Sequence, residues 1–187
     1  MKYCLFARLS ESVKNHPDAI ACQIKEGDAY KIYTYSRLYS LTLQTAGFLN
    51  REGILKQERV AILLNNSPFW PAVYFGIIAV GATAVPIDPK LTPYEVSNLI
   101  RDAQARILFT EKELYSPLKD LLKNILSFKK VALYPFDETQ NSALDVNTLR
   151  PNSPDDAASI LYTSGTTATP KGVVLTHKNF CSNFESI

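Results

Sequence analysis

Residues 162–177 of the chain read YTSGTTATPKGVVLTH, and no other stretch says as much about the fold. It places hydroxyl side chains, a glycine and a lysine between two apolar runs. These runs, at residues 159–162 and 173–175, each predict a short strand. The hydroxyl-rich segment is therefore expected to be a loop that joins two strands at the end of a sheet, which is where open α/β sheets bind ligands.

The predicted loop has the groups that a polyphosphate requires. Gly165 can adopt a positive φ without steric cost, so the backbone N–H groups around it can form an anion-binding nest. Hydroxyl donors surround that glycine, and a lysine adds a positive charge. Composition alone favours a serine- and threonine-rich surface hairpin, so the order of the residues carries the hypothesis. The candidate phosphate-binding residues are Thr163, Ser164, Gly165, Thr166, Thr167 and Lys171.

The order of residues excludes one common phosphate loop. A Walker A loop has two glycines separated by four residues, then lysine and serine or threonine, and leads into a helix. Here Lys171 precedes Gly172, and a strand is expected to follow. Thr176 after that strand is expected to cap a helix that begins near His177. The nucleotide chemistry is therefore expected to differ from that of ordinary ATPases and GTPases.

Strand and helix patterns alternate through most of the chain before this loop. Apolar strands that alternate with helices predict an α/β fold, with a parallel-rich sheet flanked by helices on both faces. A capping box at Thr92 and Glu95 opens one of these helices. Strands are expected at residues 60–64, 84–87, 106–109 and 131–133, and helices at residues 68–80, 92–104 and 114–125.

The first third of the chain has a different pattern. Apolar residues at helical spacing predict a helix around residues 5–13. Two β-rich runs flank the turn at residues 26–28 and predict a hairpin. Ser36 is expected to cap a second helix, which Gly53 ends.

Composition narrows the classes of function. The net charge of +2 gives no electrostatic case for binding nucleic acid. Cys4, Cys22 and Cys181 are odd in number and far apart, which predicts reduced thiols in a cytoplasmic protein and neither disulfides nor a zinc site. Residues 60–87 carry no charge, but proline, glycine and asparagine interrupt them, so a buried strand, helix and strand are expected there and no transmembrane segment.

Two further polar residues invite a catalytic interpretation. His177 follows the loop, but it has no partner in the sequence that suggests a triad or a metal site, so a structural role is expected. Asp88 lies between Ile87 and Pro89, and a carboxylate beside proline is typical of a turn. No catalytic residue and no metal ligand is therefore assigned in this chain.

The segment YTSGTTATPKGV resembles the phosphate-loop signature of the adenylate-forming superfamily, which includes acyl- and aryl-CoA synthetases, adenylation domains of nonribosomal peptide synthetases and beetle luciferases. Residues 33–38, YTYSRL, and residues 81–89, GATAVPIDP, resemble two upstream elements of the same family. The run LTPYEVSNLIRDAQARILF at residues 91–109 is more similar to fatty-acyl and related ligases than to peptide synthetases. Ala168 departs from the pattern, because the family usually has glycine there.

The resemblance implies a two-step ligase that uses ATP and Mg²⁺. A carboxylic acid, by this resemblance a fatty acid, is activated to an acyl-adenylate and then transferred to the thiol of CoA or of an acyl carrier protein. Thr163, Ser164, Gly165, Thr166, Thr167 and Lys171 would bind the β- and γ-phosphates.

The same resemblance identifies residues 1–187 as the N-terminal part of the family's large domain. The adenine-binding element, the ribose-binding aspartate and the C-terminal domain are not in this sequence. The chain alone is therefore expected to be inactive and to self-associate through uncovered surfaces. The alternative is a noncatalytic phosphate-binding or interaction module.

Overall fold

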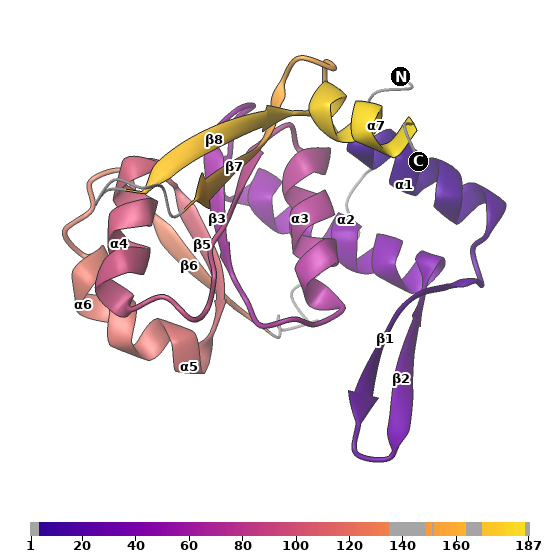
Figure 1. Ribbon diagram of the computed structural model, residues 1–187, viewed down its shortest axis with the longest axis horizontal. Coiled ribbons are helices and arrows are strands. Elements are labelled where there is room, and N and C mark those ends of the chain that lie inside the picture. The colour runs from indigo at the N-terminus through magenta and orange to yellow at the C-terminus, as the bar shows by residue number, and fades with distance from the viewer. Residues whose placement is uncertain (1–3, 135–148, 151, 164–169, 186–187) are drawn as a thin grey trace.

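The computed structural model describes residues 4–134, 149–150, 152–163 and 170–185 (Figure 1). Within these residues, a six-stranded sheet has the strand order β6-β5-β3-β4-β7-β8. The first five strands in this order are parallel, and β8 pairs antiparallel with β7. This confirms the predicted parallel-rich α/β fold. The bounds are β3 Arg59–Leu63, β4 Thr83–Pro86, β5 Ile107–Glu111, β6 Lys130–Tyr134, β7 Ala157–Thr163 and β8 Lys171–Thr176.

Helices cover both faces of the sheet (Figure 1). Val60 and Ile62 of β3 belong to a buried cluster with residues of α2 (Tyr35–Arg51) and α3 (Phe69–Ala79). Ala61 and Leu63 of the same strand belong to a second cluster with residues of α4 (Pro93–Asp102) and α6 (Lys119–Leu122). Successive residues of a strand point to opposite faces, so a strand that is apolar throughout fits a sheet buried on both sides.

The helices α2 and α3 approach closely at Gly76. A Cβ atom at this position would lie 2.5 Å from Thr45 Cβ and 2.9 Å from the backbone oxygen of Thr42. Only glycine allows this contact, because neither of those atoms belongs to the flexible end of a side chain. The uncharged stretch at residues 60–87 thus forms two strands and one packed helix, as predicted.

The N-terminal segments form a third cluster beside the sheet. Helix α1 (Leu5–Asn15) packs through Leu9 against α2, next to the hairpin of β1 (Ile20–Glu26) and β2 (Ala29–Thr34). The hairpin projects from the rest of the molecule (Figure 1).

The predicted cap of α2 is wrong by two residues. The N-cap is Thr34, whose side-chain oxygen accepts a hydrogen bond from the backbone N–H of Arg37. The backbone N–H of Ser36 instead donates to Pro17 O, and that of Tyr35 donates to Ala19 O. These contacts with the preceding loop position the helix start, and sequence spacing does not reveal them.

The helix predicted at residues 114–125 is also wrong as a single element. The segment forms α5 (Lys112–Tyr115), a 3₁₀ turn at Ser116–Leu118 and α6. Pro117 lies in the 3₁₀ turn, and a proline ring conflicts with the preceding turn of an α-helix. Leu118, Leu122 and Ile125 are nevertheless buried, so the apolar pattern correctly identified the packed face.

The capping box of α4 is confirmed. Thr92 accepts from the backbone N–H of Glu95, and the Glu95 carboxylate accepts from the backbone N–H of Thr92. Cys4, Cys22 and Cys181 are free thiols, as predicted. None of the helices that the structure describes combines the length and apolar character that crossing a membrane requires.

Candidate functional site

Two of the six predicted phosphate-binding residues lie at the loop end of the β7–β8 hairpin. β7 ends at Thr163, β8 begins at Lys171, and these two residues are register partners. Both are exposed. Because β7 runs parallel to β4, Thr163 lies at the carboxyl end of the parallel strands, where α/β sheets bind ligands. Ser164, Gly165, Thr166 and Thr167 lie outside the described residues, so their phosphate-binding role stays a prediction.

The residue before this end packs across the hairpin. Tyr162 faces Gly172 in the antiparallel register. A Cβ atom on Gly172 would lie 3.3 Å from ring atoms of Tyr162 and 2.9 Å from Ile160 Cγ2. The glycine therefore allows a close approach between the two strands at the base of the loop.

The hydroxyl of Tyr162 reaches another element. It donates to Asp102 Oδ2 at 2.5 Å, and Asp102 is the last residue of α4. Burial of the ring, followed by the contact with the Asp102 carboxylate, raises the pKa of Tyr162, so the hydroxyl keeps its proton at neutral pH. The base of the loop is thereby bonded to the helix that covers the neighbouring strands.

Sequence reasoning missed this contact. No sequence pattern relates Tyr162 to Asp102, because 60 residues separate the two. The only local signal is that an aromatic residue at the end of β7 faces a glycine on β8, a pairing in which the ring can cover the glycine.

The other end of β8 leads into α7 (His177–Glu185). Thr176 accepts from the backbone N–H of Asn179, and the Asn179 side chain accepts from that of Thr176, so the predicted cap is confirmed. The backbone N–H groups of His177 and Lys178 donate to Asp156 O and Pro154 O. These bonds join the start of α7 to the turn that precedes β7.

The side chain of His177 is fully buried. Its Nδ1 lies 3.5 Å from the backbone nitrogen of Leu5 and accepts from it, so the proton of the neutral ring is on Nε2. Nε2 has no partner among the described residues. Burial lowers the pKa of His177, an effect that Asp156 opposes and Lys56 reinforces. A neutral ring packed between α7 and α1 fits the structural role expected from the sequence.

Asp88 lies in the turn that follows β4. Its side chain is exposed, and Oδ1 accepts from the backbone N–H of Lys90 at 2.9 Å. A carboxylate that bonds the backbone two residues ahead is an Asx turn, as the Asp-Pro sequence predicted.

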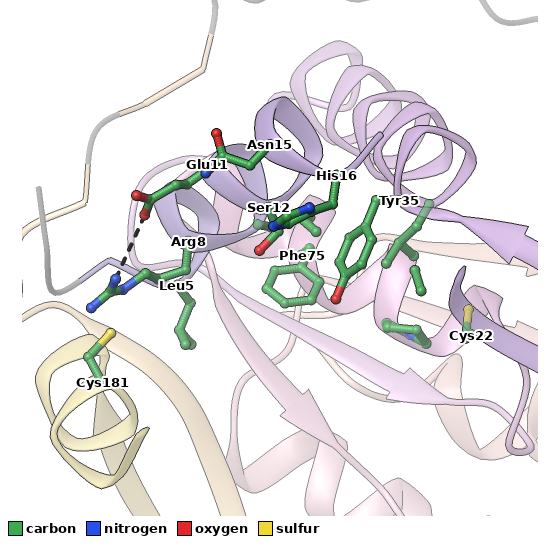
Figure 2. A pocket seen from close by; sticks show the side chains of 14 residues that line it. Leu5, Arg8, Glu11, Ser12, Asn15, His16, Cys22, Tyr35, Phe75 and Cys181 are labelled. Carbon is green, nitrogen blue, oxygen red and sulfur yellow. Dashed lines mark ion pairs between the residues drawn. The ribbon is translucent and has the colours of Figure 1, made fainter. Parts of the chain in front are cut away.

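A cavity of about 680 Å³ lies away from the β7–β8 hairpin. Figure 2 shows Tyr35 and Phe75 on one side of it and Cys181 of α7 on the other. Arg8 and Glu11 of α1 form an ion pair of 3.7 Å at this site. None of its lining residues is a predicted phosphate ligand, so the cavity is separate from the candidate site. Among the described residues, no cluster of histidine, cysteine or carboxylate side chains could bind a metal ion.

Fold and site together define a class. A parallel-rich α/β sheet presents a hydroxyl and an ammonium group at the ends of an antiparallel strand pair, and the intervening sequence is rich in hydroxyls and follows no Walker A order. Such a loop between two strands of an α/β sheet lies outside the P-loop class. The chain belongs to the AMP-binding enzyme family, whose model matches residues 9–187.

Known proteins of this type align along nearly the whole chain. A crotonobetaine/carnitine–CoA ligase from Escherichia fergusonii is 31% identical over an alignment of 180 residues that covers 89% of this chain and 35% of that protein. The structure of a fatty acyl CoA synthetase from Mycobacterium tuberculosis matches with a TM-score of 0.79 and 25% identity, over 94% of this chain and 35% of that one.

A third match comes from another branch of the family. The structure of a nonribosomal peptide synthetase, FmoA3, matches with a TM-score of 0.79 and 26% identity, over 97% of this chain and 18% of that one. The chain thus spans about a third of the length of the CoA ligases that it resembles.

Proposed function

We propose that this chain supplies the β,γ-phosphate end of the ATP site of an acid–thiol ligase. The observation that carries the proposal is the pairing of Thr163 and Lys171, which places a hydroxyl and an ammonium group on both sides of the loop. Both groups are exposed and can donate to phosphate oxygens. The similarity to a CoA ligase over 89% of the chain supports the same assignment.

The chemistry follows from the class of substrate. A carboxylate oxygen of the acid attacks the α-phosphorus of ATP, the bond between the α-phosphorus and the bridging oxygen breaks, and pyrophosphate leaves. A thiol of CoA or of a carrier protein then attacks the acyl carbon and displaces AMP. Thr163 and Lys171, with Ser164, Gly165, Thr166 and Thr167, would stabilise the charge that develops on the departing pyrophosphate. Mg²⁺ would arrive bound to the phosphates of ATP.

The acid in this proposal is a fatty acid. Its support is the fatty acyl CoA synthetase match at 25% identity. The crotonobetaine/carnitine–CoA ligase match at 31% identity supports CoA as the thiol. The full reaction is assigned to a protein with the length of these relatives. For residues 1–187 alone we propose phosphate binding without turnover.

Calorimetric titration with MgATP tests the phosphate site. The wild-type chain is expected to bind, and Lys171→Ala to bind about tenfold or more weakly, because a charge-assisted hydrogen bond contributes about 1.5–3 kcal/mol. Lys178→Ala, which removes an equal charge from an exposed position on α7, is the matched control and should bind as the wild type does. Equal affinities of the Lys171→Ala and Lys178→Ala variants would refute the assignment of Lys171.

A second measurement separates the enzyme from the alternative, a noncatalytic module. Radiolabelled pyrophosphate exchange with ATP and a panel of fatty acids is expected to give no turnover with residues 1–187. Measurable acyl-adenylate formation would disprove inactivity. Failure of the wild-type chain to bind MgATP at all would favour the interaction module over a preformed phosphate site.

A further inference from the structure

We propose that Tyr162 is a positioning residue: through its bond to Asp102 and its contact with Gly172, it sets the separation of Thr163 and Lys171 for a bound phosphate chain. This inference rests on the proposed phosphate site. It assigns a role to two residues, Tyr162 and Asp102, that are not phosphate ligands themselves.

The first argument is that few contacts other than those with β7 position strand β8. β8 is an edge strand, and its residues from Lys171 to Val174 are exposed. After β7, the element that β8 contacts most is α7, which begins directly after the carboxyl end of β8. The backbone pairing with β7 and the side chains of β7 therefore determine where Lys171 lies.

The second argument concerns the ring of Tyr162. It lies close enough to Gly172 that an added Cβ would be 3.3 Å from two ring atoms. Gly172 follows Lys171 directly, and Tyr162 precedes Thr163 directly. A rotation of the ring would thus move the strand segments next to both predicted ligands.

The third argument is the position of Asp102. A carboxylate at the last residue of a helix is disfavoured, because the helix dipole has its negative end there. Asp102 occupies this position and accepts the Tyr162 hydroxyl at 2.5 Å. The unfavourable position of the Asp102 carboxylate thus coincides with its bond to Tyr162, and residues that depart from such local preferences concentrate at functional sites. The bond connects α4, which is packed on the sheet through Val96, Leu99 and Ile100, to the less covered hairpin.

Tyr162→Phe and Asp102→Ala remove opposite ends of this bond, and Asp102→Asn tests whether the charge is needed. Tyr162→Phe keeps the ring and its contact with Gly172 but loses the hydroxyl. Asp102→Ala removes the acceptor, and Asp102→Asn removes the same charge but keeps a side-chain oxygen that can accept. Tyr94→Phe on the same helix and Asp120→Asn on α6 are controls, because both side chains are exposed and, among the described residues, neither bonds to β7 or β8.

Two readouts are compared at a temperature at which all variants are folded. Amide hydrogen exchange of residues 171–173 should be faster in Tyr162→Phe and Asp102→Ala, closer to wild type in Asp102→Asn, and unchanged in both controls. MgATP affinity should fall about two- to tenfold in the first two variants, as expected for loss of one hydrogen bond. The double variant should be no weaker than either single variant, because both remove the same bond.

Several results would overturn the proposal. Tyr162→Phe with wild-type exchange shows that the bond does not restrain the hairpin. Faster exchange with unchanged MgATP affinity, in a chain that binds MgATP, shows a structural contact without a role in the site. If the wild-type chain does not bind MgATP, the proposed function fails separately, and the exchange measurements still decide whether Tyr162 and Asp102 restrain β8.

Discussion

Replacing Gly172 with alanine should destabilise the hairpin that carries the candidate site. The new Cβ would lie 2.9 Å from Ile160 Cγ2 and 3.3 Å from the ring of Tyr162. Ile160 Cγ2 is attached directly to the branched Cβ, so it can move away only if χ1 changes to a less favoured rotamer or if β7 shifts. Overpacking of this kind costs about 1–3 kcal/mol. The smaller entropy of the unfolded alanine chain offsets about 0.4–1 kcal/mol of that cost.

The net loss in the free energy of unfolding is therefore about 1.3 kcal/mol at the middle of these ranges and at most about 2.6 kcal/mol. In a domain of this size each kcal/mol lowers Tm by about 2–4 °C, so thermal unfolding of Gly172→Ala should occur about 3–5 °C, and at most about 10 °C, below that of the wild type. Because Lys171 precedes the altered residue, MgATP affinity should fall as well. Circular dichroism with chemical denaturation measures the free energy, and calorimetric titration measures the affinity.

A double-mutant cycle shows whether the clash is the cause. Ile160→Ala removes Cγ2, so Gly172→Ala should cost less in that background than in the wild type. Val173→Ala, at an exposed position on the same strand, is the control for replacing a β8 residue by alanine. Equal costs of Gly172→Ala in the two backgrounds, or an unchanged Tm, would refute the steric reasoning.

Two other predictions concern the buried His177 and the exposed Val174. The folded state lowers the pKa of His177, so the unfolded state binds the proton more readily and stability should fall as pH decreases below about 6.5, with a slope of at most about 1.4 kcal/mol per pH unit. Denaturation between pH 7.5 and 5.5 should show this slope for the wild type but not for His177→Gln. Val174 is 56% exposed on the edge strand β8 and should promote self-association of the chain. Sedimentation velocity should show less self-association for Val174→Lys. Leu126→Lys, at an exposed position after α6, is the control and should leave self-association unchanged. A wild-type chain that stays monomeric at all concentrations would contradict the second prediction.

Features that depend on neighbouring residues were predictable from the sequence. The capping box at Thr92 and Glu95, the hairpin and the cap at Thr176 are all contained within a few residues, and the structure confirms them. The alternation of apolar strands and helices predicted the sheet for the same reason, since each element must bury its own apolar face.

The errors arose where a distant or irregular contact decided the outcome. Ser36 and Thr34 are both acceptable caps, and the bonds that the backbone of Ser36 and Tyr35 makes to Pro17 and Ala19 determine which one is used. Between residues 114 and 125 the leucine pattern was correct for burial, but Pro117 replaces one helix by shorter pieces. Periodicity describes which side chains face the core and is less informative about whether the backbone is continuous.

In the candidate site, too, some features follow from neighbouring residues and others from distant contacts. The hydroxyls and the lysine can be identified from residue order, because their chemistry is a property of each side chain. Their arrangement depends on contacts at both ends of an exposed edge strand: Tyr162 with Asp102 at one end, and His177 with Asp156 at the other. The intervening residues of β8 contribute little burial, so neither end can replace the other. This explains why the informative sequence extends beyond the hydroxyl-rich loop, from Tyr162 to His177: the proposed phosphate ligands lie between two residues whose partners, Asp102 and Asp156, come from elsewhere in the chain.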